Sequence, residues 1–436
     1  MGKSGAAVTG EKTPLKRVVM ASLVGTTIEW YDFFLYGSAA ALVFNRLFFP
    51  SGDPRLGTLL ALGTYAVGFV ARPVGGIVFG HYGDRIGRKR LLMLSLVLMG
   101  VATVLIGLLP TYAQIGIWAP IGLVLLRLVQ GFAVGGEWGG AVLMEAEHGD
   151  SRRRGFWASW PQAGVAAGSL LSAGVLALMA GVQSEADFLA WGWRVPFLLS
   201  AVLVAVGWYI RNRVSESPMF EQALEEAEAP PKLPAMDVIR ERPKAILLGA
   251  GLRVGENISY YILTVFSLTY LVEVAAESRS TALNALLIGA AVQFFAIPLL
   301  ALLSDRVGRR PVYAAGGFGL AVWMFAFFPL LGSGSAGAIV AAIMVGLVLH
   351  SAMYGPQAAF ITELFPTRIR YSGVSIAYQL TSIVAGSLAP IIALLLYDAN
   401  ESAVPVAIYV AVACVISGMS ALLARESRNV ELSQIR

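Results

Sequence analysis

A charged turn between two long apolar runs reads Gly80-His81-Tyr82-Gly83-Asp84-Arg85-Ile86-Gly87-Arg88-Lys89-Arg90. Its core returns in the second half of the chain as Ser304-Asp305-Arg306-Val307-Gly308-Arg309-Arg310. The two aspartates are 221 positions apart (305 − 84 = 221), about half of the 436 residues. A six-residue pattern repeated at this spacing predicts two copies of one structural unit.

The composition indicates an integral membrane protein. Hydrophobic residues make up 57% of the chain, charged residues only 14%, and the mean hydropathy is +0.71, whereas about a quarter of a soluble domain is charged. The apolar runs are about 20 residues long, enough to cross a bilayer core of about 30 Å. They lack the alternation of barrel strands, so helices must satisfy the backbone polar groups. We therefore predict an all-α integral membrane protein.

Twelve transmembrane helices are expected in two six-helix bundles. The expected spans are 18–46, 57–82, 91–110, 116–146, 155–181, 191–212, 243–273, 280–303, 311–331, 336–362, 371–398 and 403–424. The corresponding domains are an N-terminal tail 1–17, a first bundle 18–212, a linker 213–242, a second bundle 243–424 and a tail 425–436. The linker contains an acidic run followed by Pro230, Pro231 and Pro234, which interrupt any helix.

The distribution of basic residues predicts the orientation. Of the 32 Lys and Arg residues, four fall in the expected outer segments, three lie inside apolar runs, and the others lie in inner segments. The outer four are Arg46, Arg55, Arg194 and Arg279, and the three within runs are Arg72, Arg127 and Arg253. This bias places both termini in the cytoplasm. The pI of about 9.3 thus reflects topology, and we expect no nucleic-acid partner.

No enzymatic machinery is apparent in the sequence. It contains no phosphate-binding loop, no His-Glu-x-x-His zinc motif and no paired-cysteine metal spacing. Cys414 is the only cysteine, so an intramolecular disulfide is impossible. We expect neither a metal nor a cofactor, and not an enzyme.

The repeated loop resembles the signature of the major facilitator superfamily. More narrowly, several stretches are similar to the metabolite:proton symporter family. They are Glu29-Trp30-Tyr31-Asp32-Phe33, Arg72-Pro73-Val74-Gly75-Gly76, Gly131 to Gly140, Trp191-Gly192-Trp193-Arg194-Val195-Pro196-Phe197 and Glu363-Leu364-Phe365-Pro366-Thr367-Arg368. The resemblance implies two bundles around a cavity that opens alternately to each side. The family carries shikimate, 2-oxoglutarate, citrate, aromatic acids, and proline or betaine, and the opening run through Tyr36-Gly37 most resembles the shikimate type.

Glu29 and Asp32 are candidate proton-binding residues. They are three residues apart and so share one helical face, roughly 16–21 Å into the first span at 1.5 Å per residue. A charge at such depth costs about 2.5–3.5 kcal/mol on insertion scales, and burial favours the protonated carboxyl. A structural ion pair within the bundle is the alternative. Glu137, in the fourth span, is either a further protonation site or the partner of a basic loop residue.

Two buried arginines are candidate ligands of an anionic substrate. Arg127 lies at a depth similar to that of Asp32, and it can pair with Asp32 or Glu29 or bind a substrate carboxylate through its planar fork. Arg253 and Glu256, three residues apart in the seventh span, either neutralise each other or present Arg253 to the substrate. Polar side chains that can bind substrate or form interhelical hydrogen bonds are Gln162, Tyr36, His350, Tyr354, Gln357, Tyr378 and Gln379.

The repeated loops resemble the gating latch of the superfamily. Each aspartate can accept hydrogen bonds at a helix N-terminus, and the arginines can pair with acids on adjacent helix ends. Glu145 and Glu363 are the expected partners of Arg88 and Arg309. The complete set of gating residues is Asp84, Arg85, Gly87, Arg88, Glu145, Asp305, Arg306, Gly308, Arg309 and Glu363.

The sequence thus predicts a proton-coupled symporter that imports a small organic anion by alternating access. A shikimate-like carboxylate is the favoured candidate substrate. A dicarboxylate or a zwitterionic osmolyte such as proline or betaine is the alternative substrate. The expected partners are the organic anion, protons and membrane lipid, and the expected location is the bacterial inner membrane, with the monomer as the functional unit.

Overall fold

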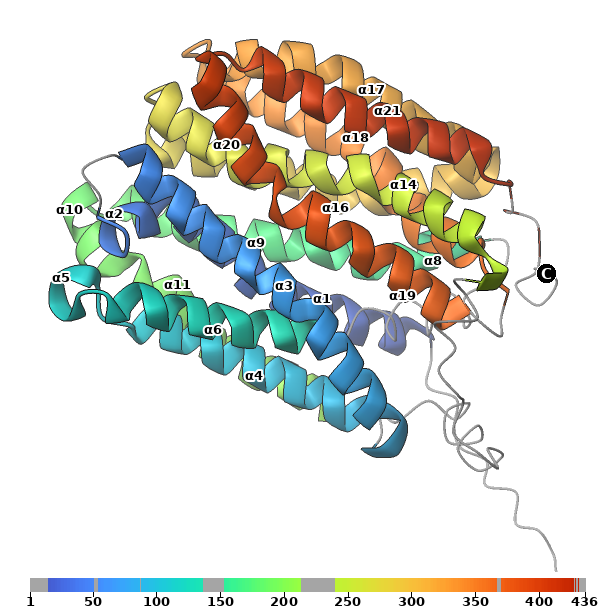
Figure 1. Ribbon diagram of the computed structural model, residues 1–436, viewed down its shortest axis with the longest axis horizontal. Coiled ribbons are helices and arrows are strands. Elements are labelled where there is room, and N and C mark those ends of the chain that lie inside the picture. Colours follow the sequence, from blue (N-terminus) through green and yellow to red (C-terminus); the bar gives the residue numbers. More distant parts are fainter. Residues whose placement is uncertain are drawn as a thin grey trace, which may run out of the picture.

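The computed structural model describes residues 15–50, 54–86, 88–135, 153–212, 240–366, 370–426, 428 and 430. Every regular element within these residues is helical. The long helices run roughly along one common direction, and the two halves of the chain lie side by side (Figure 1).

The first half contains six helical spans, several of them built from consecutive pieces. They are α1 (Leu15–Ala39) with η1 (Ala40–Phe44) and α2 (Asn45–Leu47); α3 (Pro54–Ile86); α4 (Arg88–Leu108); α6 (Trp118–Val134), preceded by the short α5 (Tyr112–Ile115); α8 (Arg154–Ala158) with α9 (Trp160–Val182); and α10 (Glu185–Asp187) with η3 (Phe188–Gly192) and α11 (Arg194–Asn212).

The second half contains six more. They are α14 (Pro243–Tyr261) with η4 (Ile262–Phe266), α15 (Ser267–Thr269) and η5 (Tyr270–Val274); α16 (Arg279–Val307); α17 (Arg309–Leu331); α18 (Ala336–Thr362); α19 (Arg370–Thr381) with η7 (Ser382–Ser387) and α20 (Ala389–Asn400); and α21 (Val404–Leu423). The twelve predicted spans are present, with ends that differ by a few residues. The inner part of the fourth span and most of the linker lie outside the described residues.

Length and hydropathy alone identify fewer spans than the fold contains. Seven helices in the described part of the chain are long and apolar enough to cross a membrane, or eight if the bent pair 185–192 and 194–210 counts as one. Three apolar helices are shorter, namely Met93–Leu108, Trp118–Val134 and Ala389–Asn400. The remaining span, α1, carries Glu29 and Asp32 in its interior. Helix breaks, the buried charges of α1 and, for Trp118–Val134, the end of the described residues at position 135 account for the difference.

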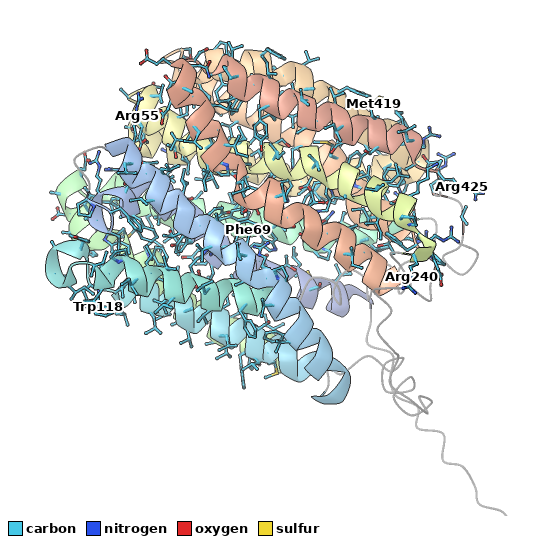
Figure 2. All side chains as sticks on the ribbon, in the orientation of Figure 1. Arg55, Phe69, Trp118, Arg240, Met419 and Arg425 are labelled. Carbon is cyan, nitrogen blue, oxygen red and sulfur yellow. The ribbon has the colours of Figure 1, made fainter. Side chains whose placement is uncertain are left out.

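The outer and inner segments of the predicted topology gather at opposite ends of the molecule. Figure 2 shows Arg55 and Trp118 near one end and Arg240 and Arg425 near the other. We call the end with Arg55 and Trp118 the outer end and the end with Arg240 and Arg425 the inner end.

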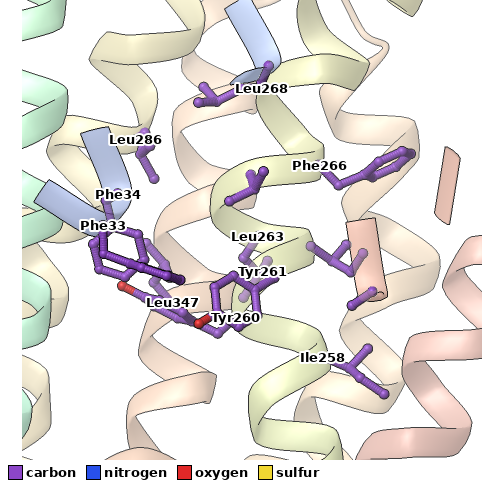
Figure 3. Packing of buried hydrophobic residues seen from close by; sticks show 14 of the residues in the cluster. Phe33, Phe34, Ile258, Tyr260, Tyr261, Leu263, Phe266, Leu268, Leu286 and Leu347 are labelled. Atoms are coloured by element: carbon purple, nitrogen blue, oxygen red, sulfur yellow. The ribbon is translucent and has the colours of Figure 1, made fainter. Parts of the chain in front are cut away.

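Helices of the two halves pack against each other in several places. Helix α9 packs along α16, α8 packs against α16 and α18, and α3 packs against η7 and α20. Aromatic rings fill the middle of this interface: Phe34 lies 5.5 Å from Tyr260 and Phe33 lies 6.3 Å from Tyr261, between ring centroids. Figure 3 shows these four residues facing one another across the interface.

Glycines allow α3 and α6 to approach closely. A Cβ atom on Gly131 would collide with the backbone carbonyl of Gly68, and one on Gly135 with the backbone carbonyl of Arg72. Small residues are what such close helix contacts require. This contact fixes the position of the central part of α6, which carries Arg127.

Candidate functional site

A small cavity lies between the two halves. Its lining residues come from α1, α9, α14, α18 and α19. They are Trp30, Val165, Arg253, Glu256, Asn257, Tyr260, Tyr261, His350, Tyr354 and Tyr378.

A buried ionic cluster forms the second-half wall of this cavity. Nη1 of Arg253 lies 3.5 Å from a carboxylate oxygen of Glu256 and donates to Oε1 of Gln357 at 2.9 Å. Gln357 in turn donates to Glu256 at 3.0 Å, and Nε2 of His350 lies 3.2 Å from the other carboxylate oxygen. The guanidinium also stacks on the ring of Tyr378, 3.4 Å from its centroid. Arg253 and Glu256 therefore form an ion pair in this conformation. This is the first of the two alternatives given for them, mutual neutralisation or binding of the substrate by Arg253.

Two polar contacts join this wall to neighbouring helices. Nδ1 of His350 lies 3.0 Å from Nε2 of Gln293 on α16. Gln162 on α9 donates to the backbone carbonyl of Tyr354 on α18 at 2.5 Å, so a first-half side chain binds a second-half helix beside the cavity. Gln162 thus forms an interhelical hydrogen bond in this conformation.

Arg127 is held in an aromatic cage in the first half. Its guanidinium carbon lies 4.6, 4.4 and 4.9 Å from the ring centroids of Phe33, Tyr36 and Tyr65. Gly68 leaves room for it, because a Cβ there would lie 2.6 Å from Nε. Nη1 donates to Gln130 at 3.0 Å, whereas Nε and Nη2 have no acceptor among the described residues. Such an unneutralised buried cation is costly unless an anion binds it.

Arg72 is a second buried cation next to the cage. Its guanidinium carbon lies 4.6 Å from the centroid of Phe33 and 4.2 Å from that of Phe69, so Phe33 contacts both arginines. Tyr261 lines the cavity and packs on Phe69 with 5.6 Å between ring centroids. The first-half lining of the cavity is Trp30 and Val165, and Tyr261 joins the cavity to Tyr65 of the cage, with 6.0 Å between ring centroids.

Asp32 is buried but makes no ion pair with Arg127 in the described part of the structure. Its carboxylate accepts a hydrogen bond from Ser200 on α11. The direct pairing considered for Asp32 and Arg127 is therefore absent in this conformation, and Arg127 donates to Gln130 instead. Glu29 is half-buried on the same helix.

The second copy of the repeated loop joins the halves at the inner end. Asp305 accepts hydrogen bonds from the backbone N–H groups of Gly155 and Phe156, both at 2.9 Å, at the start of α8. It also pairs with Arg309 at 2.7 Å. Glu363 lies 3.6 Å from Arg309, the contact that the sequence predicted, and 2.9 Å from Arg154. These contacts link α8 of the first half to α16, α17 and α18 of the second.

Gly308 allows the sharp turn between α16 and α17. Its φ of 113° lies in the region that favours glycine, and a Cβ would lie 2.7 Å from a carboxylate oxygen of Glu426. Glu426 accepts hydrogen bonds from the backbone of Arg309 and Arg310, both at 3.0 Å, at the beginning of α17. Arg306 is exposed, and its carbonyl accepts a hydrogen bond from Arg428.

Several predicted residues cannot be compared with the structure. Gly87, Glu137 and Glu145, and the side chains of Asp84, Arg85, Arg88 and Gln379, lie outside the described part. The remaining candidate, Tyr36, belongs to the cage and donates to Thr64 at 2.6 Å.

Polar contacts also join the halves at the outer end. Glu185 of the first half lies 2.8 Å from Arg279 of the second. Glu273 of the second half accepts hydrogen bonds from Thr58 at 2.6 Å and Asn45 at 3.0 Å. The halves thus touch at both ends, and the cavity lies between the two sets of contacts.

Sequence reasoning missed much of the aromatic wall. Tyr65 of the cage, Phe69 beside Arg72, and Asn257, Tyr260 and Tyr261 of the cavity were not singled out. Tyr65 and Phe69 are four residues apart and share a helical face, a signal that could have been noted. Aromatic residues at this spacing are common in any apolar helix, however, so the signal is weak without the neighbouring helices.

Two helical bundles that enclose a polar cavity and contact each other at both ends define a membrane transporter. The model of the Major Facilitator Superfamily matches residues 22–390 and 258–434. The chain therefore belongs to the Major Facilitator Superfamily and is a multi-pass membrane transporter.

Curated relatives match nearly the whole chain. A shikimate transporter of Escherichia coli (strain K12) is 43% identical over 417 residues, covering 95% of each chain. A proline/betaine transporter of the same strain is 35% identical over 426 residues, covering 95% of this chain and 84% of the relative. The inner membrane metabolite transport protein YhjE is 40% identical over 430 residues. These relatives are transporters and not enzymes.

Solved structures show the same fold. The inward-open xylose transporter XylE from E. coli superposes with a TM-score of 0.74 at 17% identity, covering 97% of this chain and 99% of XylE. Its partially occluded inward-open form gives a TM-score of 0.73. At this identity, the likeness describes the fold alone.

Proposed function

We propose that the protein is a proton-coupled symporter that imports a small organic anion across the bacterial inner membrane. A shikimate-like ring carboxylate is the leading substrate, and a dicarboxylate is the next. The first relative named above is a shikimate transporter, at 43% identity. The two bundles supply alternating access, in which the cavity opens to one side at a time.

The observation that carries this proposal is the incomplete coordination of Arg127. The side chain is 1% exposed, and two of its three nitrogens have no acceptor in the described residues. The hydroxyl of Tyr65, which belongs to the same cage, also has none. A carboxylate accepts bidentate hydrogen bonds from a guanidinium, so an organic anion would complete this site.

The transport cycle follows from these groups. A proton binds Asp32 or Glu29, and Arg127 becomes available to the carboxylate of the substrate. Substrate binding then closes the outer contacts, and the contacts of Asp305 with α8 open to release both solutes. Glu137 is a further candidate for proton binding, and the first loop, including Asp84 and Arg88, acts as a second inner latch.

A zwitterionic osmolyte is the second candidate, and the cavity offers one observation in its favour. Trp30, Tyr260, Tyr261, Tyr354 and Tyr378 line it, and aromatic rings bind quaternary ammonium groups through cation–π contacts. Relatives named proline/betaine transporters match at 35% identity. Betaine would place its carboxylate near the arginines and its ammonium group among these rings.

The remaining topological features belong to the same proposal. Both termini and the linker 213–242 lie in the cytoplasm, and the bundles comprise 18–212 and 243–424. Lipid surrounds the helices, and the monomer is the functional unit.

The test is uptake of radiolabelled shikimate into proteoliposomes under an imposed pH gradient, with an internal pH dye that reports proton entry. We expect shikimate uptake with accompanying acidification, both lost in Asp32→Asn. Asp187→Asn is the matched control, because Asp187 is exposed in the outer segment and should leave uptake unchanged.

A panel of aromatic acids, dicarboxylates, proline and betaine tests the substrate class. Transport of betaine or proline alone would replace the organic-anion proposal by the osmolyte one. Uptake of shikimate that dissipates no pH gradient would contradict proton symport.

A further inference from the structure

His350 and Gln293 form a contact on the second-half wall of the cavity that the proposed transport cycle does not use. Nδ1 of His350 lies 3.0 Å from the amide nitrogen of Gln293, and Nε2 lies 3.2 Å from Oε1 of Glu256. All three side chains are at most 2% exposed, and His350 and Glu256 line the cavity. The imidazole on α18 thus bridges α14 and α16.

The chemistry of the amide defines which imidazole nitrogen carries the proton. An amide nitrogen only donates, so Nδ1 of His350 accepts from Gln293, and the ring proton is on Nε2, facing Glu256. The amide oxygen Oε1 of Gln293 has no hydrogen-bond partner among the described residues. Rotation of the amide by half a turn presents this oxygen to Nδ1, where it accepts a second ring proton. Gln293 can therefore serve both the neutral and the protonated ring.

The carboxylate of Glu256 already faces three donor groups. Gln357 donates to Oε2 at 3.0 Å, Nη1 of Arg253 lies 3.5 Å from the same oxygen, and His350 faces Oε1. Hydrogen bonds to a carboxylate favour its charged form, so an added proton goes to the imidazole. Arg253 and Glu256 cancel each other while His350 is neutral, and the cluster gains a positive charge when His350 is protonated.

We propose that His350 is a proton-binding site in the second half, and that Gln293 is the positioning residue that accepts Nδ1–H of the protonated ring. A proton on His350 gives the cavity wall a charge that an anionic substrate neutralises. An unneutralised charge in a buried site is costly, so the proton and the anion favour each other's binding. The site is separate from Asp32 and Glu29 on α1. Its role in coupling rests on the proposed function, whereas the proton site itself does not.

Few titratable groups face His350 from its own helix and from α14. On α14 they are Glu256, with Arg253 behind it, and Tyr260, whose ring centroid lies 4.8 Å from that of the imidazole. On α18 the ring of Tyr354 lies 5.4 Å away by the same measure. Glu256 is therefore the charged group in direct contact with the imidazole.

The other helices packed against α18 place their charges away from this site. Helix α9 contains no charged residue, and the charged residues of α8, α16, α17 and α19 lie in the first or last turns of those helices. The hydroxyl of Tyr313 on α17 accepts from Gln357 at 3.1 Å, and Tyr378 on α19 stacks on Arg253. The charge of the cluster thus depends on the protonation of His350.

The first test needs no substrate. The chain contains three histidines, His81, His148 and His350, so nitrogen NMR of histidine-labelled protein in nanodiscs shows three imidazoles. Loss of one signal in His350→Gln, and its survival in the double variant His81→Gln/His148→Gln, assigns His350. We expect the neutral ring to carry its proton on Nε2 and both nitrogens to be protonated as the pH falls. A ring that keeps one form across the pH range, or a neutral ring protonated on Nδ1, would overturn the proposal.

Gln293→Met tests the positioning role. Protonation of His350 should then need a proton concentration at least about fivefold higher, because the bond lost from the charged ring is stronger than the one lost from the neutral ring. The matched control is Gln162→Met, which removes a buried amide that donates to the carbonyl of Tyr354 rather than to the imidazole. An equal shift in the two variants, or none in Gln293→Met, would contradict this role. If Gln293→Met does not fold, the wild-type titration still decides the site.

The second test asks whether this proton accompanies the substrate. Titration calorimetry of shikimate, in buffers that differ in ionisation enthalpy, reports the protons taken up as the substrate binds. At a pH where NMR shows His350 mostly neutral, uptake per shikimate bound should be lower in His350→Gln, by up to about one proton. Equal proton uptake would overturn the coupling role. Absence of shikimate binding by the wild type would count against the proposed substrate, while the NMR titration would still decide the proton site.

Discussion

Replacing Asp305 by Asn should open the inner end of the transporter. The carboxylate accepts hydrogen bonds from the N–H groups of Gly155 and Phe156, both at 2.9 Å, and these are contacts between the two halves. Asn supplies one oxygen and no charge, so one of the two bonds is lost and the other is weakened. Arg309 keeps Glu363 nearby at 3.6 Å, which limits the damage within the second half.

The size of the effect follows from the burial of this contact. A hydrogen bond to a charged group contributes about 1.5–3 kcal/mol, and the interaction of a carboxylate with a helix N-terminus contributes about 0.3–1 kcal/mol. The side chain of Asp305 is 3% exposed, so water screens its hydrogen bonds and its interaction with the helix N-terminus only weakly. We expect a total of about 2–3 kcal/mol, which shifts the ratio of closed to open inner ends roughly 30- to 140-fold.

Electron–electron distance measurements between two spin labels would detect this shift. Tyr209 on α11 and Leu423 on α21 are 59% and 67% exposed and lie in opposite halves near their inner ends. Cysteines at these positions, in a Cys414→Ser background, should report a longer distance in Asp305→Asn. The control is Asp398→Asn at the outer end, where the partly exposed pair with Arg55 at 3.3 Å contributes less than about 1 kcal/mol. An identical distance distribution in Asp305→Asn and the parent would refute the latch.

Three further predictions concern the cage, the outer end and the single cysteine. Gly68→Ala places a Cβ 2.6 Å from Nε of Arg127 and should raise the KM for an anionic substrate about tenfold, equivalent to about 1.4 kcal/mol, and an unchanged KM would argue against Arg127 as a ligand. Glu185→Gln weakens a pair with Arg279 in which the carboxylate is largely exposed, so the maximal uptake rate should change less than about fivefold. A larger change would show that the outer contacts dominate gating. Cys414 is fully buried and should react with a maleimide only after denaturation, as mass spectrometry of native and unfolded samples would show.

The positions of the helices could be predicted from the sequence. Runs of about 20 apolar residues specify where a chain crosses the bilayer, because unsatisfied backbone groups exclude other structures there. The repeat of Asp84 at Asp305 indicated two bundles, and the depth of Asp32 and Arg127 along their helices indicated that both are buried. These properties depend on position along a single helix, so they can be read without knowing the neighbours.

The tertiary structure decides which buried groups contact one another. Periodicity predicts that Arg253 and Glu256 share a face, and they do form a pair. Periodicity does not predict that Gln130 accepts a hydrogen bond from Arg127. It also does not predict that Thr103, on another helix, lies close to Asp32. Those contacts depend on the order of helices in the bundle and on the rotation of each about its axis. Both are set by close packing, such as the contact of Gly131 with Gly68, and no single helix encodes them alone.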